Sequence, residues 1–524
     1  MLSSTTLLLL CSLPAVGALP VSCLPARGAR LPRIGALLIM LAVLALAVGI
    51  FAAFDGSSAS GLAEINIPWI DSLGVNFHLA VDGLNIYLLL LTAILFPVVL
   101  GCSWTTPQAE SALFPTLLLL LEAGLLGTFL SQNLMLFFIF WEAVLIPMFV
   151  LLLVYGGDKR RQAARSFFLY TLAGSVLLLA AVILLGVEAQ RQTGHWSFEF
   201  DVLYGLHLGW GVQLFVFVAI ALACAIKCPL FPFHSWLPLA YIEAPAAGTA
   251  LMAGALSKMG AFGLLKLALP LCPLAAAVLG PYLVLLAVIS ILYGAVLALR
   301  QEDFKKLVAY SSLSHMGYIV LGIFSFQEAS LHGSLFQILS HGLAVAGLFL
   351  LLGLLQQRLG EPYRELKALS TRAPRLAVLL MLLVLTSVAL PLTSGFTSEF
   401  LILFGAFQQG MAAWQGGAGA LPLIAVLLAS TGMVLGAGYM LRFARSVLFG
   451  KADDDTAVPD LNLREALAFF PVLLLIFWVG VYPFSVMEKA QGAVTGLATP
   501  AAVTSAPPTA PLATIEINGG SHVD

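Results

Sequence analysis

Long apolar runs separated by short polar segments make up most of this sequence. The runs are bounded by charged residues, Gly or Pro and lie at 3–22, 34–54, 84–102, 112–131, 133–154, 167–188, 210–230, 246–269, 274–299, 307–325, 332–356, 377–407, 421–443 and 466–487. Since about 20 apolar residues suffice for one helical crossing of a bilayer, the pattern predicts about 14 transmembrane helices. The expected fold class is an all-α polytopic membrane protein.

Composition agrees with this pattern. Hydrophobic residues make up 60% and charged residues 10% of the 524 positions, against about 45–50% and about 25% in soluble chains. A soluble protein of this size is excluded. The apolar start of the chain resembles a secretory signal, but no Lys or Arg precedes Arg27. We therefore expect a retained first helix rather than a signal peptide.

The positions of the basic residues predict the orientation of the helices. If the loops alternate between the two sides, nearly all Lys and Arg outside the helices fall on one side, and only Arg191 and Lys489 fall on the other. Cytoplasmic loops retain positive charge, so both termini are expected on the non-cytoplasmic side. The expected location is the bacterial inner (plasma) membrane, with the thylakoid membrane as the alternative.

The cysteines and glycines give no sign of a cofactor site. The six cysteines include no CxxC pair, and no GxGxxG stands between a strand and a helix. Cys224 and Cys228 lie four residues apart, a spacing that a metal site could use, but small apolar packing residues are the favoured interpretation. We expect no cofactor and no metal on this chain.

Ionisable residues inside the apolar runs are the candidate functional groups. A charge at the bilayer centre is disfavoured by about 2.5–3.5 kcal/mol on insertion scales, so each such residue suggests a function. Static ion pairs between helices are the alternative, but residues of both signs on five predicted helices exceed what packing needs. We expect a proton relay built from Glu122, Glu142, Lys227, Lys258, His315, His341 and Glu399.

Two predicted helices contain both a buried charge and a break. Pro229 and Pro232 follow Lys227, and Pro391 precedes Glu399. Proline removes a backbone donor and clashes with the preceding turn, so the seventh and twelfth helices are expected to be broken. Breaks at corresponding positions in two halves indicate an inverted-repeat transporter, although prolines also kink membrane helices for packing alone.

The expected organisation follows from these breaks. Helices 1–3 occupy 1–111, two inverted five-helix repeats occupy 112–269 (helices 4–8) and 270–443 (helices 9–13), helix 14 occupies 444–490, and a disordered tail occupies 491–524. In the expected mechanism Glu142 holds Lys227 protonated, and loss of that partner releases the proton toward Lys258 and then Glu399.

Other polar residues are expected to have lesser roles. Lys266 should snorkel to the outer surface, and His234 should either line the proton path or cap carbonyls freed by the break. His195, His207 and His332 are expected in or beside outer loops, in contact with solvent. The spacing of Gly432 and Gly436 predicts close helix packing.

Several linked motifs resemble a known family. They are WIDSLGVNFHLAVDGLN from Trp69, WEAVLIPMF, IKCPLFPFHSWLP, EAPAAGTALMAGALSKMGAFG, FKKLVAYSSLSHMGY, SHGLAVAGLF and GFTSEFLILF. Together they resemble the antiporter-like membrane subunits of proton-pumping NADH:quinone oxidoreductase, respiratory complex I, over roughly residues 30–490. Glu399, where two of the three paralogous types usually carry Lys, favours the type called M in bacteria, 4 in mitochondria and D in plastids.

The resemblance implies specific roles. Glu142 and Lys227 match the family's pair at the cytoplasmic half-channel, Lys258 the central lysine and Glu399 the carboxylate at the exit, while Glu122, His315 and His341 match positions along the hydrated axis. The family usually shows Asp-Ala-His after Trp236-Leu237-Pro238, whereas this chain has Leu239, Ala240 and Tyr241. Roles of those two polar positions therefore do not carry over.

The resemblance also implies partners. Flavin, iron–sulfur clusters and the quinone site would belong to partner subunits, the neighbours would include the paralogous antiporter-like subunits, and the chain would move protons in response to electron transfer from NADH to quinone. A subunit of a multi-subunit cation/proton antiporter or of a membrane-bound hydrogenase is the alternative. A structural spacer without transport activity is a third, different possibility. No nucleic-acid partner is expected.

Overall fold

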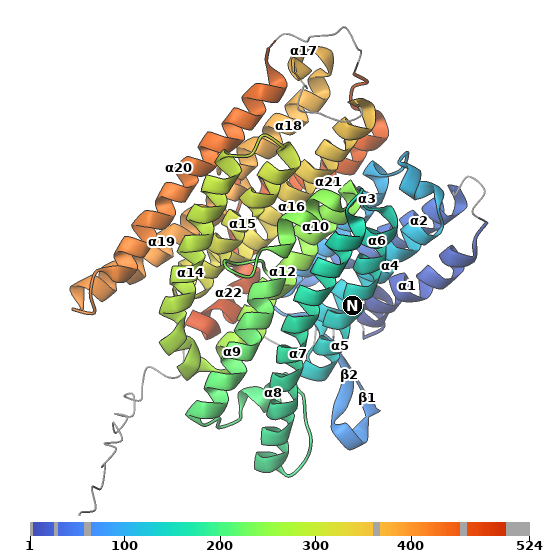
Figure 1. Cartoon of the computed structure of the whole chain (residues 1–524). Helices are drawn as coiled ribbons and strands as arrows, with labels where there is room; N and C mark the ends of the chain where they lie inside the picture. Colours follow the sequence, from blue (N-terminus) through green and yellow to red (C-terminus); the bar gives the residue numbers. More distant parts are fainter. Residues whose placement is uncertain (1–3, 26–29, 57–63, 360–366, 451–457, 499–524) are drawn as a thin grey trace, which may run out of the picture.

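The computed structural model describes residues 4–25, 30–56, 64–359, 367–450 and 458–498. Most helices run side by side in one bundle (Figure 1). The first half comprises α1 (Ser4–Cys23), α2 (Arg30–Ala53), α3 (Ile86–Cys102), α4 (Leu113–Leu130), α5 (Leu134–Ala143), α6 (Leu145–Tyr155), α7 (Arg160–Thr193), α8 (Phe200–Tyr204), α9 (Trp210–Lys227), α10 (Trp236–Glu243), α11 (Ala246–Leu251), α12 (Ser257–Gly263) and α13 (Leu269–Leu271).

The second half contains the longest buried helix and the second broken one. It comprises α14 (Pro273–Leu299), α15 (Phe304–Ile323), α16 (Glu328–Leu359), α17 (Leu369–Arg372), α18 (Pro374–Ser387), α19 (Ser394–Gln415), α20 (Leu421–Leu448), α21 (Leu463–Val481) and α22 (Phe484–Ala498). Short 3₁₀ turns lie at η1 (Asp71–Leu73) and η2 (Pro107–Glu110), and π-helical turns at η3 (Met252–Leu256) and η4 (Leu264–Ala268).

The helical membrane fold predicted from the sequence is confirmed. Among the described residues, 11 helices are long and apolar enough to cross a membrane, and Ile86–Cys102 and Pro374–Ser387 are shorter apolar helices. Each predicted apolar run coincides with one helix or with consecutive helices. The count of about 14 crossings and the inverted repeats remain predictions.

Two predicted boundaries are wrong. The run 466–487 is not one helix, because α21 ends at Val481 and α22 begins at Phe484. The disordered tail was expected from Gln491, but α22 continues to Ala498 and packs against α16. This helix is short and carries polar residues, so apolar content alone did not indicate it. Residues 499–524 lie outside the described residues.

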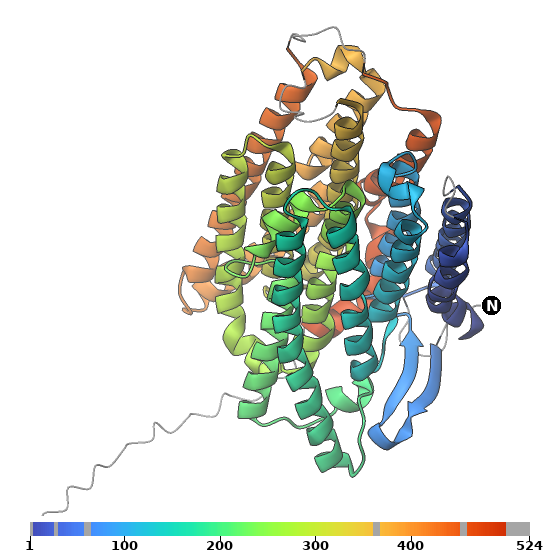
Figure 2. The same ribbon diagram turned by 45° about the vertical axis from the view of Figure 1, so that its right-hand side comes forward.

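A β-hairpin projects from one end of the bundle (Figure 2). Strands β1 (Glu64–Ile70) and β2 (Val75–Ala80) pair antiparallel, with Glu64 opposite Ala80 and Ile67 opposite Phe77. The sequence interpretation contained no strand. We call the end with this hairpin and α8 the hairpin end, and the opposite end, with the α6–α7 and α14–α15 connections, the basic end.

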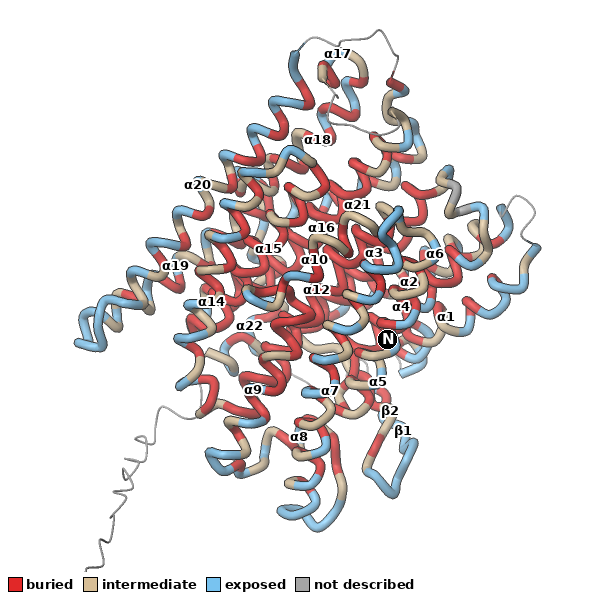
Figure 3. The backbone as a smooth tube through the Cα atoms, in the orientation of Figure 1, coloured by how far each residue is buried: buried red, intermediate tan, exposed pale blue. Residues whose placement is uncertain are grey.

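The core of the bundle lies around the central helices (Figure 3). Every residue in the most apolar stretch of 246–271 is buried. In the most apolar stretch of α16, 94% of the residues are buried, whereas in that of α20 only 28% are buried. Exposed Leu, Ile, Val and Phe on the outer helices face the surroundings as expected where lipid is the solvent. The central segment and α16 are therefore shielded on all sides.

One close backbone contact fixes the two central helices against each other. A Cβ atom added at Gly342 would lie 2.8 Å from the carbonyl oxygen of Gly254. The absence of side chains at both positions lets α16 approach η3 at backbone distance. This contact brings together, in the core, the turn of α16 that follows Gly342 and the π-turn η3 that precedes Ser257.

Candidate functional site

Lys258 lies fully buried in α12, directly after a π-helical turn. Its Nζ donates to the carbonyl of Ala253 at 2.6 Å, to Ser257 Oγ at 3.1 Å and to His341 Nδ1 at 2.9 Å. π-Turns are frequent at functional sites because they alter the regular carbonyl pattern. Here the carbonyl of Ala253 lies inside the π-turn and accepts from the lysine. The ammonium is thus satisfied by neutral acceptors rather than by a carboxylate.

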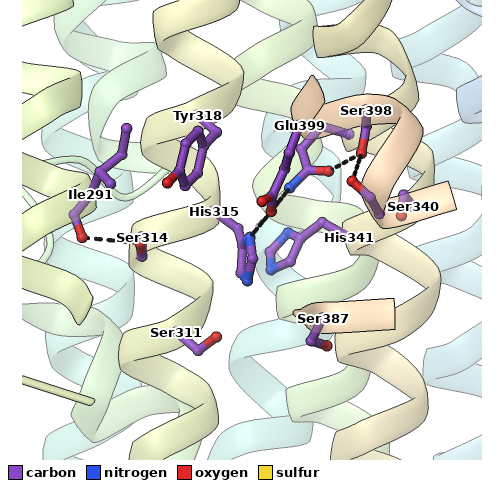
Figure 4. A network of polar contacts seen from close by, with 12 residues as sticks. Ile291, Ser311, Ser314, His315, Tyr318, Ser340, His341, Ser387, Ser398 and Glu399 are labelled. Atoms are coloured by element: carbon purple, nitrogen blue, oxygen red, sulfur yellow. Dashed lines mark hydrogen bonds and ion pairs between the residues drawn. The ribbon is translucent and has the colours of Figure 1, made fainter. Parts of the chain in front are cut away.

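Two histidines connect this lysine to Glu399. The imidazole rings of His341 and His315 lie 5.1 Å apart between centroids, and His315 Nδ1 lies 2.9 Å from Glu399 Oε1. Figure 4 shows the two rings side by side, with Glu399 next to His315. Lys258, His341, His315 and Glu399, which come from four helices, therefore form one row, with polar contacts at its two ends and a ring contact between the two imidazoles.

A small cavity borders this row. Its volume is about 10 Å³, and its lining residues include His315, His341, Glu399, Thr386 and Ser387. This volume is about what one water needs. The Nε2 atoms of His315 and His341 are buried and have no hydrogen-bond partner among the described residues. A single water in this cavity is suited to bridge the imidazoles.

Glu399 is held in place by groups that the sequence interpretation missed. Gln337 Nε2 donates to Glu399 Oε1 at 3.2 Å, and the hydroxyl of Ser398 donates to the side-chain oxygen of Gln337. Ser340 and Ser394 hydroxyls lie 2.8 Å apart beside them. The spacing of Gln337 and His341, one helical turn apart on one helix face, is the signal that could have indicated Gln337.

The predicted break of the seventh helix is confirmed. α9 ends at Lys227 and α10 begins at Trp236, with Pro229 and Pro232 in between. The indole of Trp236 donates to the freed carbonyl of Ile226 at 3.1 Å. As the last residue of α9, Lys227 places its positive charge where the helix dipole favours cations.

Lys227 contacts Trp141 rather than Glu142. Its Nζ donates to the carbonyl of Trp141 at 3.3 Å and lies 4.7 Å from the centroid of the indole. Glu142 is half-buried at the junction of α5 and α6, and its Oε1 has no hydrogen-bond partner among the described residues. The expected Glu142–Lys227 pair is thus not a direct ion pair, because the lysine is satisfied by a cation–π contact and a carbonyl.

Glu122 stands apart from the row. It is fully buried in α4, and neither carboxyl oxygen has a hydrogen-bond partner among the described residues. A buried ionised carboxylate without a partner is strongly disfavoured, so the neutral acid is the favoured form there. Its relay role remains a prediction, as do those of the other candidate residues.

The break of the twelfth helix is also confirmed. α18 ends at Ser387 and α19 begins at Ser394, with Pro391 in the connection. Ala389 and Leu392 have φ angles of 55° and 76°, a conformation that non-glycine residues rarely adopt. The chain crosses the gap in a few residues, and Glu399 follows in the second turn of α19.

Two of the lesser expectations are wrong. Lys266 does not snorkel outward, because it is buried and its Nζ lies 2.7 Å from Asp82 Oδ2 and 3.0 Å from Gln132 Oε1. His332 is not solvated, because it is buried in α16 and its Nε2 lies 3.0 Å from Gln491 Oε1. In both cases a polar partner from a distant segment covers the side chain.

The remaining lesser expectations concern packing and exposure. His195 and His207 are exposed, as expected. A Cβ at Gly432 would lie 2.3 Å from Ile291 Cγ2, which confirms close helix packing at this position. A Cβ at Gly436 would meet only Tyr439 of the same helix, with the hydroxyl oxygen at 3.7 Å, so the expectation holds for Gly432 alone. His234 stacks on Phe231 with ring centroids 5.9 Å apart, and its Nδ1 has no hydrogen-bond partner among the described residues. His234 therefore does not cap a carbonyl through Nδ1.

A second polar cluster lies at the hairpin end. His78 on β2 contacts Glu199 Oε2 at 2.5 Å through Nδ1 and Glu64 Oε1 at 2.8 Å through Nε2. Burial lowers the pKa of His78, but the hydrogen bonds and charges of Glu199 and Glu64 outweigh it and raise the pKa. The imidazolium thus ties β1 to the segment before α8.

Asp82 beside this cluster has the opposite shift. Burial raises its pKa, but the charge and hydrogen bond of Lys266, with the backbone N–H groups of Asn85 and Leu84, outweigh burial and lower the pKa. The contact between Asp82 and Lys266 joins the start of α3 to the central segment.

No redox or metal centre is indicated by the described residues. Among them, no group of three or more His, Cys, Asp and Glu side chains could hold a metal ion. Cys224 and Cys228 are buried and free of disulfides. The polar row is suited to proton transfer, because each member can both accept and donate a proton.

A polytopic helical membrane protein with two broken helices and buried Lys, His and Glu residues in contact is of the ion-translocating, antiporter-like class. Residues 131–415 match the model of the family described as NADH:quinone oxidoreductase/Mrp antiporter, TM. The chain belongs to this family.

Relatives and solved structures agree. NADH-quinone oxidoreductase subunit M of Rickettsia bellii is 36% identical over 438 residues, 83% of this chain and 85% of the relative. A chain of respiratory complex I from Thermus thermophilus with bound NADH has a TM-score of 0.81 at 32% identity, covering 94% of this chain and 99% of that one. A chain of the Mrp complex from a Dietzia species has a TM-score of 0.81 at 21% identity, covering 95% and 98%, which shows the shared fold.

Proposed function

We propose that this chain is the proton-translocating M-type membrane subunit of an NADH:quinone oxidoreductase. The observation that carries the proposal is the unbroken row of titratable groups from Lys258 through His341 and His315 to Glu399, with contacts of 2.9 Å at both ends. Family membership and the names of the relatives support the type of complex. Protons move along this row in response to electron transfer from NADH to quinone on partner subunits.

Each step conserves protons. Lys258 Nζ gives a proton to His341 Nδ1, and His341 Nε2–H gives one to a bridging water, which passes one to His315 Nε2. His315 Nδ1–H then gives a proton to Glu399 Oε1. Transfer is rapid only between groups within hydrogen-bond reach or one water apart, a condition that the two contacts and the small cavity meet.

Three acidic or basic residues would deliver protons to Lys258 in this row. Lys227, in contact with Trp141, is influenced electrostatically by Glu142, and Glu122 acts as a neutral acid. Among the described residues Lys227 Nζ contacts Trp141 and no carboxylate, and Glu142 acts on it only electrostatically. A change in the charge near Lys227 would therefore favour or disfavour its proton. Such electrostatic control is how redox chemistry on partner subunits would act on this chain.

The expected setting is a membrane arm with partner subunits. Flavin, iron–sulfur clusters and quinone are assigned to partners, and the paralogous antiporter-like subunits are the membrane neighbours. The basic end faces the cytoplasm because it carries the Lys- and Arg-rich loops, so both termini lie on the other side of the inner (plasma) membrane.

The test uses the assembled complex in sealed liposomes. We expect Glu399→Gln and Lys258→Met to lower proton pumping per NADH oxidised, while His207→Gln, which changes an exposed histidine, leaves it unchanged. Unaltered pumping in both relay variants, with assembly shown by native gel, would contradict the proposal. Purification with a flavin-free assembly that exchanges cations for protons would instead support the antiporter alternative, whose fold is shared.

A further inference from the structure

His78 on β2 lines a cavity of about 150 Å³ at the hairpin end. Its imidazole contacts Glu199 through Nδ1 and Glu64 through Nε2, and its side chain is 10% exposed. A neutral imidazole carries a single N–H group, whereas the protonated ring donates through both nitrogens. Both carboxylates therefore receive a hydrogen bond from His78 only while the imidazole is protonated.

The other charged groups at this cavity leave the two carboxylates in control of His78. The further titratable residues that line it are Asp82, Asp201, Tyr204 and Lys266. Lys266 Nζ lies 2.7 Å from Asp82 Oδ2, so this carboxylate has its own basic partner. Burial lowers the pKa of His78, and the hydrogen bonds and charges of Glu199 and Glu64 outweigh burial and raise it. The protonation of His78 thus depends on these two carboxylates and on the pH at the hairpin end.

Glu199 also holds the first turn of α5. Its Oε1 accepts from Asn133 Nδ2 at 2.8 Å. The side-chain oxygen of Asn133 accepts from two backbone N–H groups of the first turn, at 3.1 and 3.3 Å, so Asn133 is the N-cap of α5. In addition, the N–H of Leu134 donates to the carbonyl of Phe198 at 2.7 Å. The segment before α8 and the start of α5 are therefore tied by both side-chain and backbone hydrogen bonds.

The other end of α5 carries the partner of Lys227. Trp141 lies eight residues after Asn133, which corresponds to about 12 Å along a helix. Its carbonyl accepts from Lys227 Nζ at 3.3 Å, and the centroid of its indole lies 4.7 Å from that nitrogen. α5 has 10 residues and ends at Ala143, and α6 begins separately at Leu145. Rigid helices carry coupling between distant sites, so a shift at the capped end of α5 displaces Trp141.

We propose that Asn133 and Glu199 position Trp141 against Lys227, and that protonated His78 holds Glu199 in the place that this requires. The inference rests on the proposed function, in which the hairpin end faces the side that receives the protons. Loss of the proton from His78 leaves one N–H group for two carboxylates, which loosens the segment before α8 and the first turn of α5. Lys227 is then held less well at Trp141, and proton transfer becomes less effective.

The test varies the pH on the hairpin-end side alone. In sealed liposomes that oxidise NADH on the outside, this side is the lumen, whose pH is set when the vesicles are formed. At constant outer pH, we expect a rise of the lumenal pH through the titration range of His78 to lower the initial pumping per NADH severalfold. Mass action has the opposite sign, because a less acidic lumen makes proton release easier. A fall in pumping therefore reports a titrating group rather than the driving force.

Two variants interrupt the link at different places. Asn133→Asp keeps the N-cap, because Asp and Asn cap helices about equally well, but it removes the amide that donates to Glu199. His78→Gln removes the titrating group. We expect both variants to pump severalfold less than the unmodified complex at acidic lumenal pH and to lose the dependence on lumenal pH. Asn462→Asp, the same change at the N-cap of α21, is the matched control and should behave like the unmodified complex.

The readouts separate positioning from folding. A folding defect lowers assembly on a native gel and thermal stability, but it leaves the dependence on lumenal pH in the molecules that assemble. Pumping by the unmodified complex that does not fall as the lumenal pH rises would overturn the inference, and so would an assembled Asn133→Asp variant that keeps the full pH dependence. If Lys258→Met abolishes pumping in the same preparation, the proposed function stands and only the positioning role is wrong. If Lys258→Met also pumps normally, the proposed function fails.

Discussion

Lys258 Nζ lies 2.9 Å from His341 Nδ1, although 83 residues separate them in sequence. The contact forms because α16 and the π-turn η3 meet at glycine positions, which leaves no side chains between their backbones. The lysine donates to an imidazole rather than to a carboxylate, so its proton has an acceptor that can release it again. This relationship leads to the first prediction.

Replacing His341 by Phe should interrupt the row. The variant keeps an aromatic ring of similar size but removes the acceptor of Lys258 and the nitrogen that faces the small cavity. We expect proton pumping by the assembled complex to fall by about a hundredfold, the lower end of what a positioned proton-transfer group contributes. The measurement is fluorescence quenching in sealed liposomes, normalised to NADH oxidation. The exposed His207→Phe is the control, and equal pumping by both variants would count against the relay.

Gln337 should act by positioning Glu399. Gln337→Leu removes the amide that donates to Glu399 Oε1 at 3.2 Å and takes away one acceptor of the Ser398 hydroxyl, which still donates to the carbonyl of Ser394. We expect a severalfold loss of pumping with a shifted pH profile, because the carboxylate loses one of its hydrogen bonds. Ser325→Ala, which removes a hydroxyl bound only to its own helix at Leu321, should change neither quantity. A pH profile identical to that of the unmodified complex would show that Gln337 only fills space.

The β-hairpin should loosen as the pH rises. The folded-state pKa of His78 is raised above 6.5 by Glu199 and Glu64 despite burial. Its contribution to stability is therefore fully present below the unfolded pKa and is lost as the pH rises through the folded pKa. Hydrogen exchange of the amides of β1 and β2, corrected for the intrinsic pH dependence, should show lower protection above that range. His78→Gln should remove this pH dependence, and a hairpin whose protection is independent of pH before mutation would contradict the assignment.

The ion pair at the basic end should be needed for stability. Arg358 Nη2 lies 2.5 Å from Glu465 Oε2, and both side chains are at most 10% exposed. Glu465→Leu leaves a buried guanidinium without its carboxylate, which typically costs about 3–5 kcal/mol. We expect a lower melting temperature of the purified complex and partial recovery in Arg358→Met/Glu465→Leu. Arg464 Nη2 also lies 3.5 Å from Glu465 Oε1, so the single variant leaves two guanidinium groups without this carboxylate. An unchanged melting temperature in the single variant would contradict the prediction.

The sequence by itself determined the class of fold and the identity of most relay candidates. Apolar runs long enough to cross a bilayer admit helices as the only structure that satisfies the backbone, and ionisable residues inside them are too costly to be accidental. The prolines after Lys227 and before Glu399 predicted both helix breaks. The reason is local, because proline lacks the N–H group that would continue the helical hydrogen bonds.

The tertiary structure alone decided which of these groups meet. Sequence reasoning expected Glu142 to hold Lys227 protonated and included His315 and His341 in the relay without fixing their place in it. The fold gives Lys227 a carbonyl and an indole, and places His341 and His315 between Lys258 and Glu399. It also added Gln337, which only its spacing from His341 could have indicated, and the hairpin cluster, which joins segments far apart in the sequence. Helix periodicity fixes which residues share a face, but distances between faces depend on how glycines and breaks let the helices approach, and that is a property of the packed bundle.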